Sequence, residues 1–290
     1  MKKIIAIVGP TAVGKTNLAI KIAKYLNTDV ISGDSVQVYR HLDIGSGKIK
    51  ESEKEGVVHH LIDIINPNED YTVSDFQKDA RLLIDEMTEK GKIPLFSGGT
   101  GLYLKAAFYD YDFSSVKRDN RFLEWTNEEL QSKLKSLNDP ELPDINNRKR
   151  LERHLELLTS TPLTKPGKDI PLYDVLLIGL TMNREHLYQK IDERVDQMMM
   201  DGLVLEAKDL YDQGIKSKSV TSIGYRELYS YLNHEISLDT AVSLIKQHTR
   251  NFAKRQYTWL KNQMHPKWID VEVEDPYLKA KELIDIFLKE

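Results

Sequence analysis

The chain begins with a buried-strand pattern, a glycine-rich loop and a helical pattern, in that order. Residues 4–8 (IIAIV) form a continuous apolar run, which is typical of a strand buried on both faces of a parallel sheet. The loop GPTAVGKT at 9–16 follows, and residues 17–26 place apolar side chains at helical spacing. This order is the context that the pattern G-x-x-x-x-G-K-[ST] requires. It predicts a phosphate-binding loop after the first strand of an α/β sheet.

The residue types of this loop suit the binding of a polyphosphate. Gly9 and Gly14 allow backbone turns that point amide groups at phosphate oxygens, and Lys15 adds a positive charge. The Thr16 hydroxyl can ligate Mg²⁺, and the helix that starts here adds the positive end of its dipole. The pattern does not identify the molecule that carries the phosphates. We expect the phosphates to be held by Gly9, Pro10, Thr11, Ala12, Val13, Gly14, Lys15 and Thr16.

Further along the chain, short apolar runs alternate with helical patterns. We expect further strands at 30–31, within 57–65, at 93–97 and at 175–180, and helices at 17–26, 74–90 and 146–159. The order indicates an α/β fold: a parallel sheet flanked by helices, like that of the P-loop NTPases, with an inserted helical subdomain.

The helix at 74–90 contains a misleading motif, LLIDE at 82–86. An apolar run before Asp-Glu is typical of the magnesium-binding strand of many ATPases. Here the neighbouring residues have a period of 3.6, Ser74 with Gln77 forms a capping box, and Gly91 ends the pattern. We therefore interpret the motif as helix.

The alternation also suggests a division into parts. We expect a discontinuous catalytic core and two helical additions that form a lid or cleft. The core would comprise 1–113, about 146–182 and 236–290, and the additions 114–145 and about 183–235.

Composition excludes several classes of protein. No run of about 18 apolar residues occurs, so we expect no membrane span. The chain has no cysteine, which excludes disulfides and thiolate zinc sites, and we expect a cytoplasmic enzyme. The net charge of −4 argues against nucleic-acid binding over the whole surface, but it leaves a basic cleft open.

Two further loops follow predicted strands and so belong at the ligand-binding edge of the sheet. Asp34 follows the second strand, where it can act as a general base or support the metal. Capping of a helix N-terminus is an equally good interpretation, because Asp is favoured there. Thr100, after Gly98 and Gly99, can donate to an oxyanion, although taken alone this stretch is better interpreted as a strand-to-helix turn.

Several motifs together resemble one family. In chain order they are GPTAVGKT (9–16), SGDSVQVY (32–39), DIGSGK (43–48), FSGGTGLYLKA (96–106), RLERHLE (150–156), IGYRE (223–227), Thr249-Arg250 and AKRQYTW (253–259). Their combination and order resemble the tRNA dimethylallyltransferases over nearly the whole chain. Residues 114–144 match less clearly. The chain lacks the C-terminal zinc finger of eukaryotic relatives, so the resemblance is to the bacterial type.

The resemblance implies a reaction. The family transfers a dimethylallyl group from dimethylallyl diphosphate to the exocyclic amine of the adenosine just 3′ of the tRNA anticodon. The products are N6-isopentenyladenosine and diphosphate. By resemblance, the loop at 9–16 holds the donor diphosphate with Mg²⁺, Asp34 is the general base, and Lys15, Thr100 and Arg226 stabilise the leaving group. The alternative for Arg226 is a surface salt bridge with Glu227.

The resemblance also implies contacts with the anticodon stem-loop of tRNA. The residues it marks are Asp34, Ser35, Val36, Gln37, Thr100, Arg121, Lys149, Arg150, Leu151, Glu152 and Arg153. Lys246, Arg250 and Lys254 repeat every four residues, and no acid occurs between 243 and 268, which favours RNA contact there as well. We expect Tyr257 and Trp259 to be core residues, and the protein to be a monomer with no membrane partner.

Three other functions share some of these features. A P-loop kinase uses the same loop for ATP. An isopentenyltransferase that modifies free adenine nucleotides shares the chemistry but needs no RNA groove. A nucleotide-switch module leaves Asp34 and Arg226 without a role, and the guanine-reading Asn-Lys-x-Asp element is absent.

Overall fold

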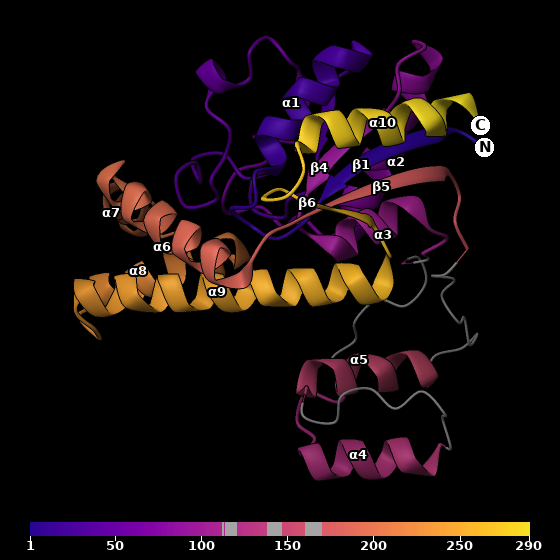
Figure 1. The fold of residues 1–290 in the computed structure, drawn as a ribbon. Coiled ribbons are helices and arrows are strands. Elements are labelled where there is room, and N and C mark those ends of the chain that lie inside the picture. Colours follow the sequence, from indigo (N-terminus) through magenta and orange to yellow (C-terminus); the bar gives the residue numbers. More distant parts are fainter. Residues whose placement is uncertain (112, 114–120, 138–146, 160–169) are drawn as a thin grey trace. The chain divides into compact units, whose positions relative to one another are not determined.

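The computed structural model describes residues 1–111, 113, 121–137, 147–159 and 170–290 (Figure 1). The chain forms two compact units: unit 1 is Met1–Tyr109 with Pro171–Glu290, and unit 2 is Asp110–Ile170. In the described part of the chain, no helix combines the length and the apolar character needed to cross a membrane.

Unit 1 is built on a parallel sheet, as the sequence predicts. The strands are β1 (Lys3–Val8), β2 (Val30–Ser32), β3 (His59–His60), β4 (Leu95–Gly98), β5 (Asp174–Thr181) and β6 (Lys267–Asp270). They lie in the order β3-β2-β4-β1-β5-β6, and every neighbouring pair is parallel. The sequence does not predict β6, because only Ile269 of its four residues is buried.

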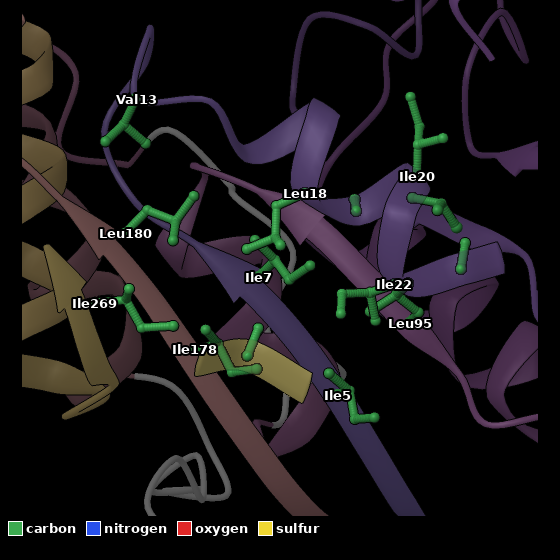
Figure 2. Close-up of a cluster of buried hydrophobic side chains, with 14 of the residues drawn as sticks. Ile5, Ile7, Val13, Leu18, Ile20, Ile22, Leu95, Ile178, Leu180 and Ile269 are labelled. Carbon is green, nitrogen blue, oxygen red and sulfur yellow. The ribbon is translucent and has the colours of Figure 1, made fainter. Parts of the chain in front are cut away.

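The alternating side chains of β1 fix which helices cover each face of the sheet. Ile5 and Ile7 pack with α1 (Lys15–Leu26) and α10 (Pro276–Lys289), which lie side by side in Figure 1. Figure 2 shows this core, with Ile178 of β5 beside Ile5 and Ile7. Ile4, Ala6 and Val8 face α2 (Val73–Glu89) and α3 (Gly101–Phe108) on the other side. Both faces of β1 are therefore buried, which explains its continuous apolar run.

The α2 helix contains the LLIDE motif, which confirms the helical interpretation. Its cap differs from the predicted one. Thr72, not Ser74, is the N-cap residue: its hydroxyl accepts from the Asp75 amide at 3.3 Å, and the Asp75 carboxylate accepts from the Thr72 amide at 2.8 Å. The Gln77 side chain instead donates to the Ala106 carbonyl of α3 at 2.8 Å. The capping box thus forms two residues before the predicted one.

The C-terminal helices form a third hydrophobic cluster within unit 1. They are α6 (Arg184–Met200), α7 (Leu203–Asp212), α8 (Tyr225–Leu232) and α9 (Leu238–Gln263), with a 3₁₀ turn at Lys218–Thr221. Val38, Tyr39 and Leu42, from the segment after β2, are buried in the same cluster. Residues 183–235, which the sequence suggested as a separate addition, thus lie in unit 1 because they share a core with it.

Unit 2 contains α4 (Asn127–Ser136) and α5 (Arg148–Leu158). The two helices share a small core of Phe122, Leu130, Leu134, Leu151 and Leu155. Residues 146–170 therefore belong to unit 2. The division suggested by the sequence had instead placed them in the catalytic core.

The two ends of unit 2 lie beside each other. The Asp110 amide donates to the Ile170 carbonyl at 3.0 Å, and the Ile170 amide donates to the Asp110 carboxylate at 2.9 Å. Next to them, Tyr109 and Pro171 form an antiparallel bridge in unit 1. The insertion thus leaves and rejoins the sheet unit at one place.

Candidate active site

A cavity of about 360 Å³ lies at the carboxyl ends of β1, β2 and β4. Its walls come from the phosphate loop, the loops after β2 and β4, and helices α6, α8 and α9. Every residue of its lining belongs to unit 1. The polar and charged residues that line it include Thr11, Lys15, Thr16, Asp34, Gln37, Thr100, Arg194, Arg226, Arg255 and Gln256.

The phosphate loop has the backbone conformation that its glycines predict. Gly14 has a φ of +101° and caps α1, and Ala12 is also left-handed with a φ of +66°. Gly9 has a φ of +149°, and a Cβ there would lie 2.7 Å from the Leu180 carbonyl oxygen of β5. The loop is therefore pressed against β5 and opens at the N-terminus of α1, where an anion is favoured.

Gln256 of α9 links the phosphate loop to the loop after β4. Its Oε1 accepts from the Thr11 amide at 2.9 Å, and its Nε2 donates to the Gly99 carbonyl at 3.0 Å. Its side chain is buried, and a Cβ at Gly99 would lie 2.1 Å from Nε2. In the sequence, Gln256 is part of the motif AKRQYTW at 253–259 and has no role of its own, because no local pattern shows that α9 packs against the loop at 9–16.

Replacing Gln256 with leucine is expected to destabilise the protein. The Thr11 amide and the Gly99 carbonyl lose their partners, at a cost of about 1–3 kcal/mol for each group left unsatisfied. Denaturant unfolding measures the change. Gln247→Leu, on an exposed position of the same helix, is the matched control. Equal unfolding midpoints for the two variants would show that the link is not structural.

Asp34 holds the turn that follows β2. Its Oδ1 accepts from the backbone amides of Val36 at 2.8 Å and Gln37 at 3.3 Å, but no described helix begins here, so the helix cap that the sequence allowed does not form. It also lines the cavity. Among the described residues, Oδ2 accepts no hydrogen bond. One oxygen thus fixes the side chain, and the other stays available for a proton.

Thr100 lies beside the Asp34 loop. Its Oγ1 accepts from the Ser35 amide at 3.2 Å and lies 3.4 Å from the Ser35 hydroxyl. The two loops approach backbone to backbone, since a Cβ at Gly98 would lie 2.3 Å from the Gly33 carbonyl oxygen. Gly98 and Gly99 therefore form the turn after β4. Because they have no side chains, the two loops come close enough for Thr100 to contact Ser35, the residue after Asp34.

Lys15 gives the phosphate loop its charge. Its Nζ donates to the Pro10 carbonyl at 2.7 Å. Burial lowers the pKa of Lys15 to about 8, the positive charge of Arg194 contributes to the lowering, and Asp34 opposes both effects. Two cations that disfavour each other's charge thus share one cavity, which fits an anionic ligand.

Arg226, on α8, lines the same cavity and also forms a salt bridge with Glu227, which the sequence analysis gave as the alternative role. Its Nε lies 2.5 Å from Oε1 of Glu227, which is buried. The same carboxylate contacts His248 Nδ1 at 2.7 Å and accepts from the Gly224 amide at 2.8 Å. The salt bridge holds Arg226 on the cavity wall.

Two of the basic residues of α9 form ion pairs with a neighbouring helix. Lys246 pairs with Asp196 at 2.6 Å and Arg250 with Asp192 at 2.5 Å, both on α6. The stretch 243–268 contains no acid, so the acidic partners come from another part of the chain. Lys254 and Arg255 are exposed and, within the part of the chain that the structure describes, form no ion pair.

Trp259 of α9 packs against the core, as predicted, whereas Tyr257 is half-buried and belongs to no hydrophobic cluster of the described residues. Trp259 packs with the α2 and α3 core, where a Cβ at Gly101 would lie 2.1 Å from its ring. The rings of Tyr257 and Trp268 have their centroids 4.9 Å apart.

The other residues that the resemblance marked for RNA lie in unit 2. Lys149 and Arg150 are exposed. Leu151 is fully buried and packs in the unit 2 core, so we assign its side chain to packing and not to RNA contact. Three further residues form local contacts: Glu152 with Arg148 at 2.7 Å, Arg153 with Glu156 at 3.1 Å and Arg121 with Thr159 at 3.4 Å.

Comparison with known proteins places the chain in one family. The model of the family described as IPP transferase matches residues 37–263. A tRNA dimethylallyltransferase of Anoxybacillus flavithermus is 44% identical, over 93% of this chain and 91% of that protein.

Solved structures show the same similarity. The tRNA isopentenylpyrophosphate transferase of Bacillus halodurans is 41% identical, with a TM-score of 0.77 over 99% of this chain and 95% of that one. A eukaryotic dimethylallyltransferase acting on tRNA is 27% identical, with a TM-score of 0.84 over 98% of this chain and 78% of that one. From the match to the family model and this full-length similarity, it follows that the chain belongs to the IPP transferase family.

Proposed function

We propose that this chain transfers a dimethylallyl group from dimethylallyl diphosphate to tRNA. The acceptor is the exocyclic amine of the adenosine just 3′ of the anticodon, and the products are N6-isopentenyladenosine and diphosphate. The observation that carries the proposal is that Asp34 and the phosphate loop line one cavity. The names of the relatives, tRNA dimethylallyltransferase, support the same activity.

The donor end of the reaction needs a stabilised leaving group. The loop Gly9–Thr16 and the N-terminus of α1 favour an anion, and Lys15, Thr100 and Arg226 line the same cavity. As the allylic carbon–oxygen bond breaks, its electron pair goes to the diphosphate. The positive groups therefore act where negative charge develops.

The Thr16 hydroxyl, which lines the cavity at the start of α1, fits a magnesium ion. Mg²⁺ keeps several waters and binds through substrate phosphates, so one protein oxygen suits it. When bound, the ion supplies further neutralisation of the diphosphate charge.

The acceptor end needs a base. The adenine amine is a poor nucleophile because its lone pair is delocalised into the ring. As the amine nitrogen forms its bond to the allylic carbon, it loses a proton, and Asp34 Oδ2 accepts it. The two backbone amides that hold Oδ1 keep this carboxylate in place during the transfer.

The adenosine must leave its stack to reach the cavity, as bases do in enzymes that modify them. We propose that residues 34–37 and Thr100 contact the extruded nucleotide. Arg121, Lys149, Arg150, Glu152 and Arg153 of unit 2 contact the rest of the anticodon stem-loop, so the helical additions form the RNA-binding surface. The exposed charges of Lys149 and Arg150 support this role. A cytoplasmic monomer would suffice for the reaction.

The proposal is tested with Mg²⁺, labelled dimethylallyl diphosphate and unmodified tRNA that has an A-A-A run beside the anticodon. Label is expected on the adenosine next to the anticodon, and none on a tRNA with guanosine at that position. Label on free AMP would instead indicate a free-nucleotide prenyltransferase. ADP formed from ATP, without any transfer, would indicate a kinase.

A further inference from the structure

Arg194 lies at the junction of two hollows of unit 1. It comes from the middle of α6 and lines the active-site cavity. It also lines an adjacent cleft of about 730 Å³. Thr16, the proposed magnesium ligand, lines both hollows as well. Arg194 therefore shares the cavity wall with the start of α1, and no motif in the sequence marked it.

Arg194 has no acidic partner within the described residues. Its one hydrogen bond there is a long contact of 3.5 Å from Nη2 to the Gly47 carbonyl. The acids within two residues of it on its own helix have other partners: Asp192 pairs with Arg250, Glu193 accepts from Gln189, and Asp196 pairs with Lys246. Burial lowers the pKa of Arg194, although Asp34 and Glu53 oppose the effect from a distance. A partly buried cation without a counter-ion is costly unless a ligand supplies the negative charge.

The segment 43–48 leaves room for this guanidinium. Gly47 has a φ of +59°, and a Cβ there would lie 1.5 Å from Arg194 Nη2. Any larger residue at 47 would displace the guanidinium. The carboxylate of Glu206 holds this segment, since it accepts from the amides of Asp43 at 2.9 Å and Ile44 at 2.8 Å. The position of Arg194 is thus built by two elements that are far apart in sequence.

We propose that Arg194 binds the diphosphate of the isoprenoid donor from the α6 side of the cavity, together with Lys15 and the phosphate loop. The inference rests on the proposed function and adds a ligand that the phosphate-loop pattern does not contain. A guanidinium can hold two phosphate oxygens at once, so it both orients the donor and stabilises the leaving diphosphate. Arg194 and Lys15 thus bring positive charge to the departing group from two separate elements.

The test measures binding of inorganic diphosphate with Mg²⁺ by calorimetry. Arg194→Gln is expected to weaken binding by about 10- to 100-fold, the usual effect of losing a hydrogen bond to a charged group. Arg194→Lys keeps the charge but not the paired donors, and its affinity is expected to fall between those of the wild type and Arg194→Gln. Lys190→Gln, on an exposed position of the same helix, is the matched control and should bind like the wild type.

Thermal unfolding provides a second readout. Free Arg194→Gln should unfold at the wild-type temperature or above it, because a cation without a partner is removed. The rise in unfolding temperature on adding diphosphate should shrink. Gly47→Ala, which leaves Arg194 in the sequence but takes its space, should weaken diphosphate binding, and the double variant should add little to either single one.

The outcomes separate this inference from the proposed function. Equal diphosphate binding by the wild type, Arg194→Gln and Arg194→Lys would overturn the role of Arg194, whatever the wild type does with tRNA. A wild type that binds diphosphate through Arg194 but transfers no dimethylallyl group would instead overturn the proposed reaction and keep the anion site.

Discussion

Replacing Asp34 with asparagine is expected to slow dimethylallyl transfer by about 10²- to 10⁴-fold, the range for loss of a general base. The amide oxygen of the substituted side chain can still accept from the amides of Val36 and Gln37, so the loop should keep its shape. The group that is lost is the second oxygen, which accepts the proton. Single-turnover transfer to tRNA measures the rate, and calorimetry with inorganic diphosphate should show nearly unchanged binding.

The matched control is Asp209→Asn, which changes an exposed carboxylate on α7. This variant should transfer at the wild-type rate. If Asp34→Asn transfers as fast as Asp209→Asn, then Asp34 is not the base and its role is limited to holding the amides of Val36 and Gln37. If Asp34→Asn loses diphosphate binding as well, the substitution has disturbed the loop, and the rate must be compared at saturating donor.

Replacing Lys15 with methionine is expected to lower kcat/KM by about 10²- to 10³-fold, as when one donor to a developing negative charge is removed. Lys15 also predicts a pH dependence. In the free protein its pKa is about 8, lowered chiefly by burial. Bound diphosphate favours the charged form and raises that pKa. Above this pKa the free lysine is neutral, so binding must take up a proton, and affinity should fall by roughly tenfold per pH unit.

Calorimetry with inorganic diphosphate from about one pH unit below this pKa to about one and a half units above it measures the slope. Lys15→Arg keeps a charge that does not titrate in this range, so its affinity should be flat with pH. Lys15→Met should bind weakly and also without the slope. A wild-type slope that persists in Lys15→Arg would assign the titration to another group.

The phosphate loop, the sheet and the position of Asp34 could be predicted because each depends on local sequence. A strand buried on both faces needs an apolar run, and the loop needs glycines at fixed positions, as Gly9 and Gly14 show. In parallel sheets the carboxyl ends of the strands meet at one edge, which places Asp34 and Thr100 together once the strands are known.

The remaining features depend on contacts between distant segments. Gln256 and Arg194 come from helices whose packing no local pattern reveals. Each side chain lies where a Cβ would clash, Gln256 at Gly99 and Arg194 at Gly47, and the need for these glycines is visible only in the folded chain. Lys246 and Arg250 looked free because their acidic partners lie 50 and 58 residues earlier. The boundary of unit 2 was misplaced for a similar reason: α5 has a basic amphipathic pattern whose apolar side packs on α4.

Because the ends of residues 110–170 lie beside each other, this segment can change in evolution independently of the sheet. Asp110 and Ile170, the first and last residues of this segment, are hydrogen-bonded to each other, so the segment is an insertion between two adjacent points of the sheet unit. Lengthening it, shortening it or exchanging it leaves the strand order and the phosphate-binding edge untouched. Under the proposed function, substitutions in this segment that alter RNA recognition would leave the groups that break the carbon–oxygen bond in place, because the residues that line the cavity all belong to unit 1.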